Sequence, residues 1–407
     1  MCPSGCLRRL FRENDSLYDS LPLADKRVSS LAKKNMEKKK VFYFLTAMHI
    51  GGTEKALLGL LSTIDYSQTE VHLGLLHKEG GLLEHVPEQV LVHAVSLNPE
   101  LLGEDNLPTT GSVRYFFRRG QIIKALCISV LYLLSIFSKR YRASMFRYVL
   151  KDEPVFPDYF DEAYAFSGIN ELVTFYVAEK VKANLKVCWI HFDVAKEYVD
   201  RSFFIRQMIH YQKIYLVSAQ AKQSFDNVFP SLASKSESHY NIVPREHIIE
   251  LSKVGQSYED GYDGIRLLTI ARMSSEKGIE DALYALSELI QKGIQVRWYF
   301  IGDGPRMDQF RQLSRNLALQ DDAVFLGSLI NPYKFLKECD IYIQPSRSEG
   351  YCIAIAEARC LDKPIVATDF AGAREQLTGR DNSYIVGVHA QTLCEGIHKM
   401  IQKMGLE

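Results

Sequence analysis

The sequence lacks several features that would assign it directly to a class of protein. Its eight cysteines are scattered, with no C-x-x-C pair and no cluster with histidine at metal-ligand spacing, so no structural metal is expected. Lysine plus arginine and aspartate plus glutamate number 49 each, and this balance gives no indication of a nucleic-acid partner. The hydrophobic content is that of a globular protein, and free thiols in apolar runs favour a reducing cytoplasm as the compartment.

One strongly apolar segment is too short to cross a membrane. Within residues 111–150, the charge-free part runs only from Ala125 to Phe137, whereas a spanning helix needs about 20 residues. A basic-flanked apolar helix suits peripheral docking on an anionic membrane surface, here the inner face of the plasma membrane. A buried helix of the first domain with solvated ends is the alternative. The flanking basic residues are Arg114, Arg118, Arg119, Lys139, Arg140, Arg142 and Arg147.

The N-terminal region carries no strand pattern, and residues 1–35 lack the apolar core of a signal peptide. Residues 1–39 are therefore expected to lie outside the fold, as a flexible extension or because translation starts at Met36. From residue 41 onward, strand and helix patterns alternate, as a parallel sheet requires. The 407 residues predict two domains, at 40–243 and 244–388, followed by a C-terminal helix in 389–407.

A loop and a helix in the second half carry the most functional information. Apolar residues at 340–345 predict a buried strand, and 353–361 predict the helix that follows it. Glu349 would then lie in the loop above a parallel sheet, where open α/β folds bind ligands. Glu357 would lie about two helical turns further on. These carboxylates suit sugar hydroxyls and a second diol such as a ribose, although two glutamates at this spacing also occur by chance in many surface helices.

Three other turns place candidate binding residues at the ends of predicted strands. Gly51 and Gly52 allow the backbone to approach a phosphate or an acceptor closely, although a Gly-Gly pair more often marks only a tight turn. His191 ends an apolar strand, where a histidine is more often a satisfied core residue than a catalytic one. Arg272 and Lys277 could neutralise a pyrophosphate. Solvated helix-start charges are the alternative, but a lysine there opposes the helix dipole.

Taken in order, these motifs resemble those of the family 4 retaining glycosyltransferases. The resemblance spans roughly residues 40–385 and is far more specific than any single motif. It implies the GT-B fold, an α/β architecture in which two Rossmann-like domains with parallel sheets face each other across a cleft. The matching segments are the glycine loop 50–54, the histidine strand 189–193, the phosphate clamp 268–278, the turn 301–305, the nucleobase segment 324–333 and the block 346–375.

The resemblance also implies a reaction and the residues that perform it. A sugar would move from a nucleoside-diphosphate sugar to an acceptor with retention of anomeric configuration, and no metal or other cofactor would be needed. Arg272 and Lys277 would stabilise the leaving diphosphate, Glu349 would hold sugar hydroxyls, and His191 would position the transferred sugar. The residues assigned to the nucleotide are Gly51, Gly52, Gly327, Tyr333, Gly350, Tyr351, Cys352 and Glu357, the last of these at the ribose.

Two departures from the family pattern stand in the second half. Cys352 replaces the small residue or proline that is common after Glu-Gly-Phe/Tyr, and Asn382-Ser383 stands where Asn-Gly is usual. The overall pattern resembles bacterial enzymes that build capsular or other surface polysaccharides, so the expected acceptor is a lipid-linked or growing surface glycan. A non-hydrolysing sugar-nucleotide epimerase, a phosphorylase and a catalytically silent scaffold are the alternatives on the same fold.

Overall fold

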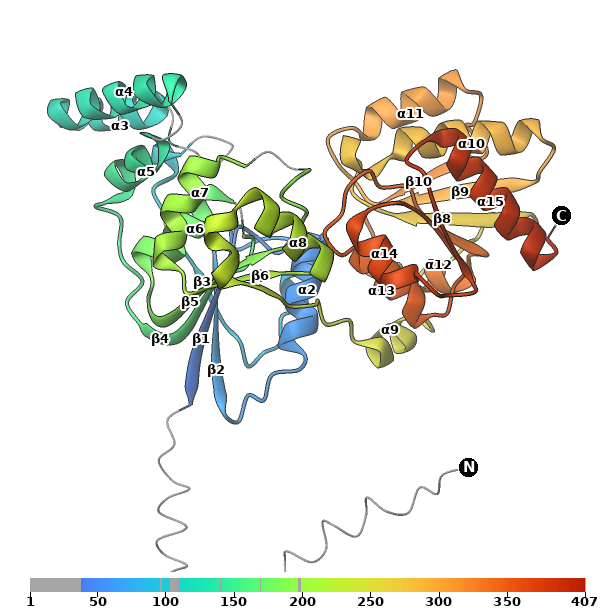
Figure 1. The fold of residues 1–407 in the computed structure, drawn as a ribbon, viewed down its shortest axis with the longest axis horizontal. Coiled ribbons are helices and arrows are strands. Elements are labelled where there is room, and N and C mark those ends of the chain that lie inside the picture. The colour runs from blue at the N-terminus through green and yellow to red at the C-terminus, as the bar shows by residue number, and fades with distance from the viewer. Residues whose placement is uncertain are drawn as a thin grey trace, which may run out of the picture.

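Two parallel β-sheets, each covered by helices on both faces, form the two halves of the computed structural model (Figure 1). The structure describes residues 38–95, 97–102, 108, 110–138, 141–168, 170–196 and 199–406. The predicted N-terminal extension therefore lies outside the described residues, apart from its last two positions. The predicted fold class, two Rossmann-like domains with parallel sheets, is confirmed.

The first sheet has seven strands in the order β3-β2-β1-β4-β5-β6-β7, all parallel. Its strands are β1 (Lys39–Leu45), β2 (Thr69–Leu75), β3 (Leu91–Ala94), β4 (Tyr159–Ala165), β5 (Lys182–Ile190), β6 (Lys213–Leu216) and β7 (Ser236–Ser238). The helices of this half are α2 (Gly52–Leu61), α3 (Thr110–Arg118), α4 (Ile122–Phe137), α5 (Arg142–Leu150), α6 (Glu171–Lys180), α7 (Arg201–Gln207) and α8 (Ala219–Val228).

The second sheet has six parallel strands in the order β10-β9-β8-β11-β12-β13. Its strands are β8 (Ile265–Ile270), β9 (Val296–Ile301), β10 (Ala323–Gly327), β11 (Ile341–Gln344), β12 (Ile365–Thr368) and β13 (Ser383–Val386). The helices are α9 (Arg245–Leu251), α10 (Ile279–Gln291), α11 (Met307–Asn316), α12 (Tyr333–Glu338), α13 (Ile353–Cys360), α14 (Ala371–Leu377) and α15 (Ala390–Met404).

Central strands such as β1 are buried on both faces, which is why they read as continuous apolar runs. Phe42 and Phe44 belong to the core on one face of the first sheet, whereas Tyr43 and Leu45 belong to the core on the other face. This alternation follows from the two-residue period of a strand.

In each sheet the strand order reverses once along the chain, between β1 and β4 in the first and between β8 and β11 in the second. The carboxyl ends of strands at such a reversal open a crevice in which α/β folds bind ligands. The loops after β1, β8 and β11 therefore occupy the binding position in their sheets. They contain the glycine loop, the two predicted cations and Glu349 respectively.

The segment that joins the two sheets differs from its prediction. Residues 240–244 are expected to form an interdomain strand, but the last strand of the first sheet is β7, and residues 239–244 are irregular. The chain here leaves one sheet for the other, so a ladder partner is lacking along most of the segment. Gly59 of α2 packs closely against the Ile242 carbonyl, which ties the segment to the first half.

The apolar segment of the first half forms α4, and most of that helix is not buried. Among its residues only Lys124, Ala125 and Ile128 are buried. With α3, it lies at the end of the first half that is farthest from the second (Figure 1). The alternative of an ordinary buried helix is therefore wrong for most of α4. The basic residues Lys139 and Arg140 lie outside the described residues.

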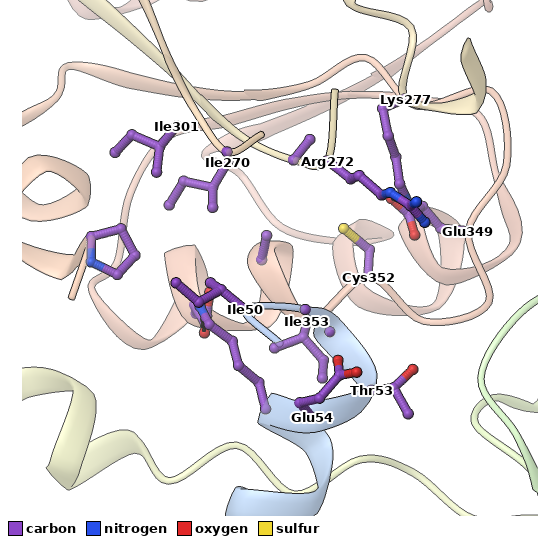
Figure 2. Close-up of a pocket in the computed structure, with 18 of the residues that line it drawn as sticks. Ile50, Thr53, Glu54, Ile270, Arg272, Lys277, Ile301, Glu349, Cys352 and Ile353 are labelled. Atoms are coloured by element: carbon purple, nitrogen blue, oxygen red, sulfur yellow. Dashed lines mark hydrogen bonds and ion pairs between the residues drawn. The ribbon is translucent and has the colours of Figure 1, made fainter. Parts of the chain in front are cut away.

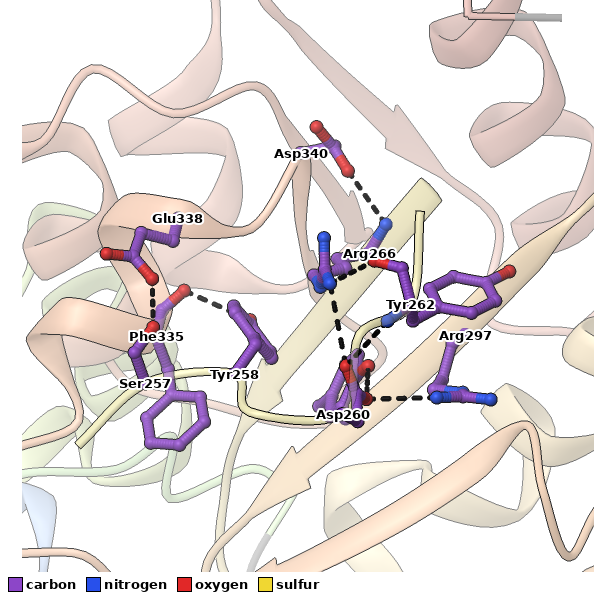
Figure 3. Close-up of polar contacts among 10 residues, drawn as sticks. Ser257, Tyr258, Asp260, Tyr262, Arg266, Arg297, Phe335, Glu338 and Asp340 are labelled. Atoms are coloured by element: carbon purple, nitrogen blue, oxygen red, sulfur yellow. Dashed lines mark hydrogen bonds and ion pairs between the residues drawn. The ribbon is translucent and has the colours of Figure 1, made fainter. Parts of the chain in front are cut away.

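The carboxylate of Asp260 accepts several of the hydrogen bonds that hold the loop preceding β8 (Figure 3). Its Oδ2 accepts hydrogen bonds from Arg297 Nη1 at 3.0 Å and from the Tyr299 hydroxyl. Its Oδ1 accepts from the Tyr262 amide at 3.2 Å, with Arg266 Nη2 at 3.5 Å. Burial alone would raise the pKa of Asp260, but these hydrogen bonds outweigh it and hold the pKa below its ordinary value.

Candidate functional site

A cavity of about 470 Å³ lies between the two halves, within the size range of small-molecule sites. It is lined by residues that follow strands of both sheets and by the start of α2 and of α13 (Figure 2). Nine of the predicted site residues line it: Gly51, Gly52, His191, Arg272, Lys277, Glu349, Tyr351, Cys352 and Glu357. The other three, Gly327, Tyr333 and Gly350, do not.

Lys277 and Glu349 form an ion pair on one wall of this cavity. Lys277 Nζ donates to Glu349 Oε1 at 2.8 Å, and Ser346 Oγ donates to the same oxygen at 2.9 Å. Burial alone would lower the pKa of Lys277, but the carboxylate beside it outweighs burial and raises the pKa above its ordinary value. Lys277 therefore stays charged in the cleft, and Glu349 offsets its unfavourable place before α10.

Arg272 lies next to this pair and forms no ion pair with any residue that the structure describes. Figure 2 shows its side chain extending toward Lys277 and Glu349 on the same side of the cavity. Arg272 and Lys277 thus place two cations at the ends of β8 and β11, beside the carboxylates of Glu349 and Glu276, which also line the cavity. Two neighbouring cations suit an anionic group such as a phosphate.

His191 lies at the end of β5 with its imidazole enclosed by aromatic rings. The ring centroid is 4.7 Å from that of Phe166 and 6.0 Å from that of Trp189. Burial lowers the pKa of His191 to about 3, and the backbone of Phe166 opposes this only weakly. Neither ring nitrogen has a hydrogen bond of good geometry to another described residue. His191 is therefore neutral and has hydrogen-bonding capacity left for a ligand.

Glu357 lies on α13, almost fully buried, with a side chain only 2% exposed. Its Oε1 accepts hydrogen bonds from Lys55 Nζ and from the Tyr333 hydroxyl, each at 2.7 Å. The ammonium also lies 5.1 Å from the centre of the Tyr333 ring. Tyr333 thus contributes to the site through Glu357 and does not itself line the cavity.

Gly350 has a structural reason to be glycine that the sequence does not reveal. A Cβ at this position would lie 2.6 Å from the His191 carbonyl oxygen, so any side chain would push the two halves apart. The Gly350 carbonyl also accepts a hydrogen bond from Ser218 Oγ at 2.9 Å. Gly350 therefore allows the loop after β11 to approach the first sheet closely. This structural role is separate from the phosphate contact predicted for it.

Gly327 lies at the end of β10 with a φ of +74°, a conformation that favours glycine. Its carbonyl accepts a hydrogen bond from the Gly302 amide at 2.8 Å. The cavity wall after β10 is made instead by Ser328 and Leu329, the two residues that follow. The predicted nucleobase segment thus faces the cavity one residue later than Gly327.

The cavity-lining residues that are absent from the sequence-based assignment include Glu54 and Lys55, at the start of α2. The Glu54 carboxylate folds back over Gly51, where a side chain would collide with it. Burial raises the pKa of Glu54 to about 7, and the cation of Arg272 counteracts only part of this shift. Their signal in the sequence is their place at the end of the glycine loop and directly after it. That signal points to a role only when the residues of the other half that they face are known.

Cys352, a departure from the family pattern, has an unusual backbone conformation. It is the residue before α13 and has a φ of +67°, a backbone conformation that is strained for residues other than glycine. Burial raises the pKa of its thiol well above the ordinary value, so the thiol is no nucleophile.

Among the described residues, no group of three or more His, Cys, Asp or Glu side chains could hold a metal ion.

A protein-family model matches nearly the whole second half. The model for "Glycosyl transferases group 1" matches residues 258–406, from the Asp260 loop to the end of α15. The second half therefore matches the glycosyl transferases group 1 domain. This match confirms the glycosyltransferase family predicted from the motifs, and the matched residues include Arg272, Lys277, Glu349 and Glu357.

Curated relatives of this chain carry glycosyltransferase names. An uncharacterised glycosyltransferase of Methanocaldococcus jannaschii is 27% identical over 41% of this chain and 42% of its own length. The alpha-monoglucosyldiacylglycerol synthase of Streptococcus pneumoniae is 30% identical over 31% and 28%. A Campylobacter jejuni diphospho-undecaprenol 4-alpha-N-acetylgalactosaminyltransferase is 23% identical over 47% and 52%. This chain thus spans about half or less of the length of these relatives.

Solved structures match over most of the chain. HepE from Anabaena in complex with UDP and glucose aligns with a TM-score of 0.63 at 17% identity, covering 90% of this chain and 91% of HepE. TarM from Staphylococcus aureus, in a complex that includes UDP, aligns with a TM-score of 0.61 at 12% identity, covering 90% and 94%. At such identities these matches establish the shared fold of both halves.

Proposed function

We propose that this protein is a retaining glycosyltransferase. It would transfer a sugar from a nucleoside-diphosphate sugar to a lipid-linked or growing surface glycan. The observation that carries the proposal is the interdomain cavity, where Arg272, Lys277, Glu349, Glu357 and His191 meet although they are distant in the sequence. An epimerase or a scaffold gives no comparable reason for this set to converge.

Each polar group of the cavity has a place in the proposed reaction. Arg272 and Lys277 would take the diphosphate, whose negative charge grows as the bond to the sugar breaks. Glu349 would accept hydrogen bonds from sugar hydroxyls, and Glu357 from the ribose. The amide groups at the start of α13 would face the phosphates. His191 is neutral and would position the sugar by a hydrogen bond.

Retention follows if the acceptor attacks from the face that the phosphate leaves. The bond between the anomeric carbon and the phosphate oxygen breaks, and a bond to the acceptor oxygen forms on the same face. The proton of the acceptor hydroxyl passes to the departing phosphate oxygen, so no separate base is required. Closure of the two halves would exclude water and align the acceptor.

The decisive experiment is calorimetric binding of UDP, GDP and ADP, and of their common sugar conjugates, to the purified protein. Base-selective binding that is lost in Lys277→Ala supports the donor site. Failure of every nucleotide to bind the wild-type protein would overturn it and favour a non-catalytic scaffold. Incubation with the selected donor and a membrane extract would then test for transfer, and the anomeric configuration of the product would test retention.

A lipid-linked acceptor has two lines of support. The names of the Streptococcus pneumoniae and Campylobacter jejuni relatives refer to a diacylglycerol and to a diphospho-undecaprenol. In addition, α4 presents an apolar face to its surroundings, with Phe137 87% exposed. The exposed apolar residues of α4 are Ile122, Ile123, Leu126, Val130, Leu133, Leu134, Ile136 and Phe137.

Most of these side chains share one face of the helix, because positions 126, 130, 133, 134 and 137 recur at helical spacing. Exposed Arg118 and Arg119 at the end of α3 add positive charge nearby. No helix in the described part of the chain combines the length and the apolar character needed to traverse a bilayer. We therefore propose that α4 lies in the surface of an anionic membrane.

Sedimentation with vesicles tests this docking. Wild-type protein should sediment with vesicles that contain phosphatidylglycerol and much less with phosphatidylcholine vesicles. The double variant Leu126→Asp/Leu133→Asp should lose sedimentation and keep nucleotide binding, because these residues lie far from the cavity. Equal sedimentation of wild-type and variant proteins would contradict a role for α4.

A further inference from the structure

Glu357, the carboxylate proposed to bind the ribose of the donor nucleotide, is held by a residue from the opposite half of the molecule. Glu357 belongs to α13 in the second half, whereas Lys55 belongs to α2 in the first, 302 positions away in the sequence. Their side chains are 2% and 15% exposed, and their charged atoms are 2.7 Å apart. This ion pair crosses the cleft at the cavity wall itself, since both residues line the cavity.

The two oxygens of Glu357 are used unequally. Oε1 receives both Lys55 and the Tyr333 hydroxyl, whereas Oε2 is buried without a hydrogen-bond partner among the described residues. A buried carboxylate oxygen without a donor is costly. Since Glu357 lines the cavity, a hydroxyl group of a bound ligand is the natural donor for Oε2.

Lys55 also determines how the carboxylate of Glu357 is oriented. The ammonium of Lys55 and the Tyr333 hydroxyl both donate to Oε1 at 2.7 Å, and together they fix the rotation of the carboxylate. Without Lys55, Glu357 would lose its ion pair and one of the two contacts that orient Oε2.

We infer that Lys55 is a positioning residue for the donor nucleotide: it holds the carboxylate of Glu357 in the orientation in which Oε2 accepts the ribose hydroxyls. The inference rests on the proposed function, because it takes the ligand of Glu357 to be a ribose. The inference goes beyond the proposed function in one respect. The nucleotide site of the second domain is completed by the first, so nucleotide binding and closure of the two halves are coupled.

The test compares two nucleotides as well as variants of the full-length protein. Titration calorimetry first identifies which of UDP, GDP and ADP binds the wild type, and then uses that nucleotide and its 2′,3′-dideoxy analogue. Lys55→Met, which keeps the length of the side chain, should weaken binding of the ribonucleotide about 10-fold. It should weaken binding of the dideoxy analogue less than twofold, because the hydroxyls that Glu357 would hold are missing.

Three further variants make the result specific. Lys55→Arg should retain most of the affinity, since a guanidinium can also pair with Glu357. Glu357→Gln should weaken ribonucleotide binding, and adding Lys55→Met to it should cost little more. Lys124→Met is the matched control: Lys124 has a side chain 10% exposed and pairs with Asp152 at 2.6 Å, and it does not line the cavity, so nucleotide affinity should be unchanged.

The outcomes separate this inference from the proposed function. If none of the three nucleotides binds the wild type, the proposed function itself fails. If the wild type binds but Lys55→Met weakens both nucleotides equally, Lys55 only maintains the structure and the inference alone is overturned. Tighter binding in Lys55→Met would overturn it as well, because Lys55 would then be a competitor of the ribose.

Discussion

The Asp260 cluster and the interdomain cavity are both rich in charge, but they differ in how far their polar atoms are satisfied. Both oxygens of Asp260 have partners within the second domain, including Arg297 and Tyr299 (Figure 3). In the cavity, one oxygen of Glu357 has no hydrogen-bond partner among the described residues, and neither ring nitrogen of His191 has a hydrogen bond of good geometry. Saturated carboxylates anchor a fold, whereas buried unsatisfied groups leave bonds for a ligand.

The comparison also shows which residues each cluster joins. Asp260 connects residues within about 40 positions of it, all in one domain. The cavity joins Lys55 to Glu357 and Lys277 to Glu349 across 302 and 72 positions. We therefore expect substitutions in the first cluster to affect mainly stability and substitutions in the second to affect mainly binding and catalysis.

The largest effect is expected for Lys277→Ala. Removing this cation takes away a donor that would stabilise the departing diphosphate, and the transfer rate should fall by about 10²–10³-fold. The unfolding temperature should change much less than for substitutions of Asp260. Initial rates with the donor identified by calorimetry, together with thermal unfolding of both proteins, measure the two effects.

Lys253→Ala provides the control for that variant. Lys253 pairs with Glu250 at 2.7 Å on the surface, with a side chain 51% exposed, and does not line the cavity. Its loss should leave the transfer rate unchanged. Full activity of Lys277→Ala would contradict the assignment of the cavity as the donor site and, with it, the contrast between the two clusters.

The Asp260 cluster should respond in the opposite way. Asp260→Asn weakens the hydrogen bonds from Arg297 and Tyr299, and we expect a loss of about 1–2 kcal/mol in the free energy of unfolding at pH 7 with little change in nucleotide affinity. Urea unfolding and calorimetry measure the two quantities. Asp263→Asn, an exposed neighbour in the same loop, should have neither effect.

The pH dependence of this loss has a definite sign. The pKa of Asp260 is lower in the folded protein than its ordinary value of 3.8, so the carboxylate stabilises the fold above pH 3.8. That contribution disappears as the pH falls from 3.8 through the folded pKa. The difference between wild type and Asp260→Asn should therefore shrink in acid. A difference that stays constant down to pH 2 would contradict the role of the charge.

Much of the fold could be predicted from the sequence because its parallel strands are short apolar runs with polar ends. The strand predicted at 340–345 contains β11, and the helix predicted at 353–361 contains α13. The prediction of a strand at 240–244 was wrong, because apolar residues there pack between the halves without pairing with a neighbouring strand.

The predicted site residues fall on loops at strand ends, so their convergence follows from parallel topology once the strands are known. Lys55 and Glu54 were missed for a different reason. Their meaning depends on which residues of the other half they face, Glu357 and Arg272, and no local pattern encodes that facing. The environment of His191, enclosed by rings from β4 and β5, likewise depends on tertiary packing.

Glu54→Gln should stabilise the protein at alkaline pH. The pKa of Glu54 is about 7 in the folded state against an ordinary value of 4.5. Between these values the folded state binds more protons than the unfolded state, so stability falls as the pH rises from 4.5 to 7. The variant escapes this loss and should gain on the order of 2 kcal/mol at pH 8 and nothing near pH 4.

Chemical unfolding at several pH values tests this, with the exposed Glu88→Gln of the same half as a control that should show no such trend. A gain in Glu54→Gln that is equal at pH 4 and pH 8 would contradict the unfavourable ionisation of Glu54. It would also weaken the contrast with Asp260, whose ionised form is the stable one in the fold.

The smallest effect concerns the strain at the start of α13. Because Cys352 has a φ of +67°, Cys352→Gly should be more stable than Cys352→Ala by about 1 kcal/mol. Comparing these two variants with each other, and not with wild type, removes the contribution of the buried sulfur.

The matched pair at Cys394, a buried residue inside α15, should show the reverse order, since glycine in a helix interior costs about 1 kcal/mol relative to alanine. Equal stability of the two Cys352 variants would mean that the loop relaxes without strain. If glycine is more stable than alanine at position 352 but less stable at position 394, the backbone conformation of Cys352 is strained. Like the unsatisfied atoms of Glu357 and His191, that strain is then a cost that the cavity imposes on the fold.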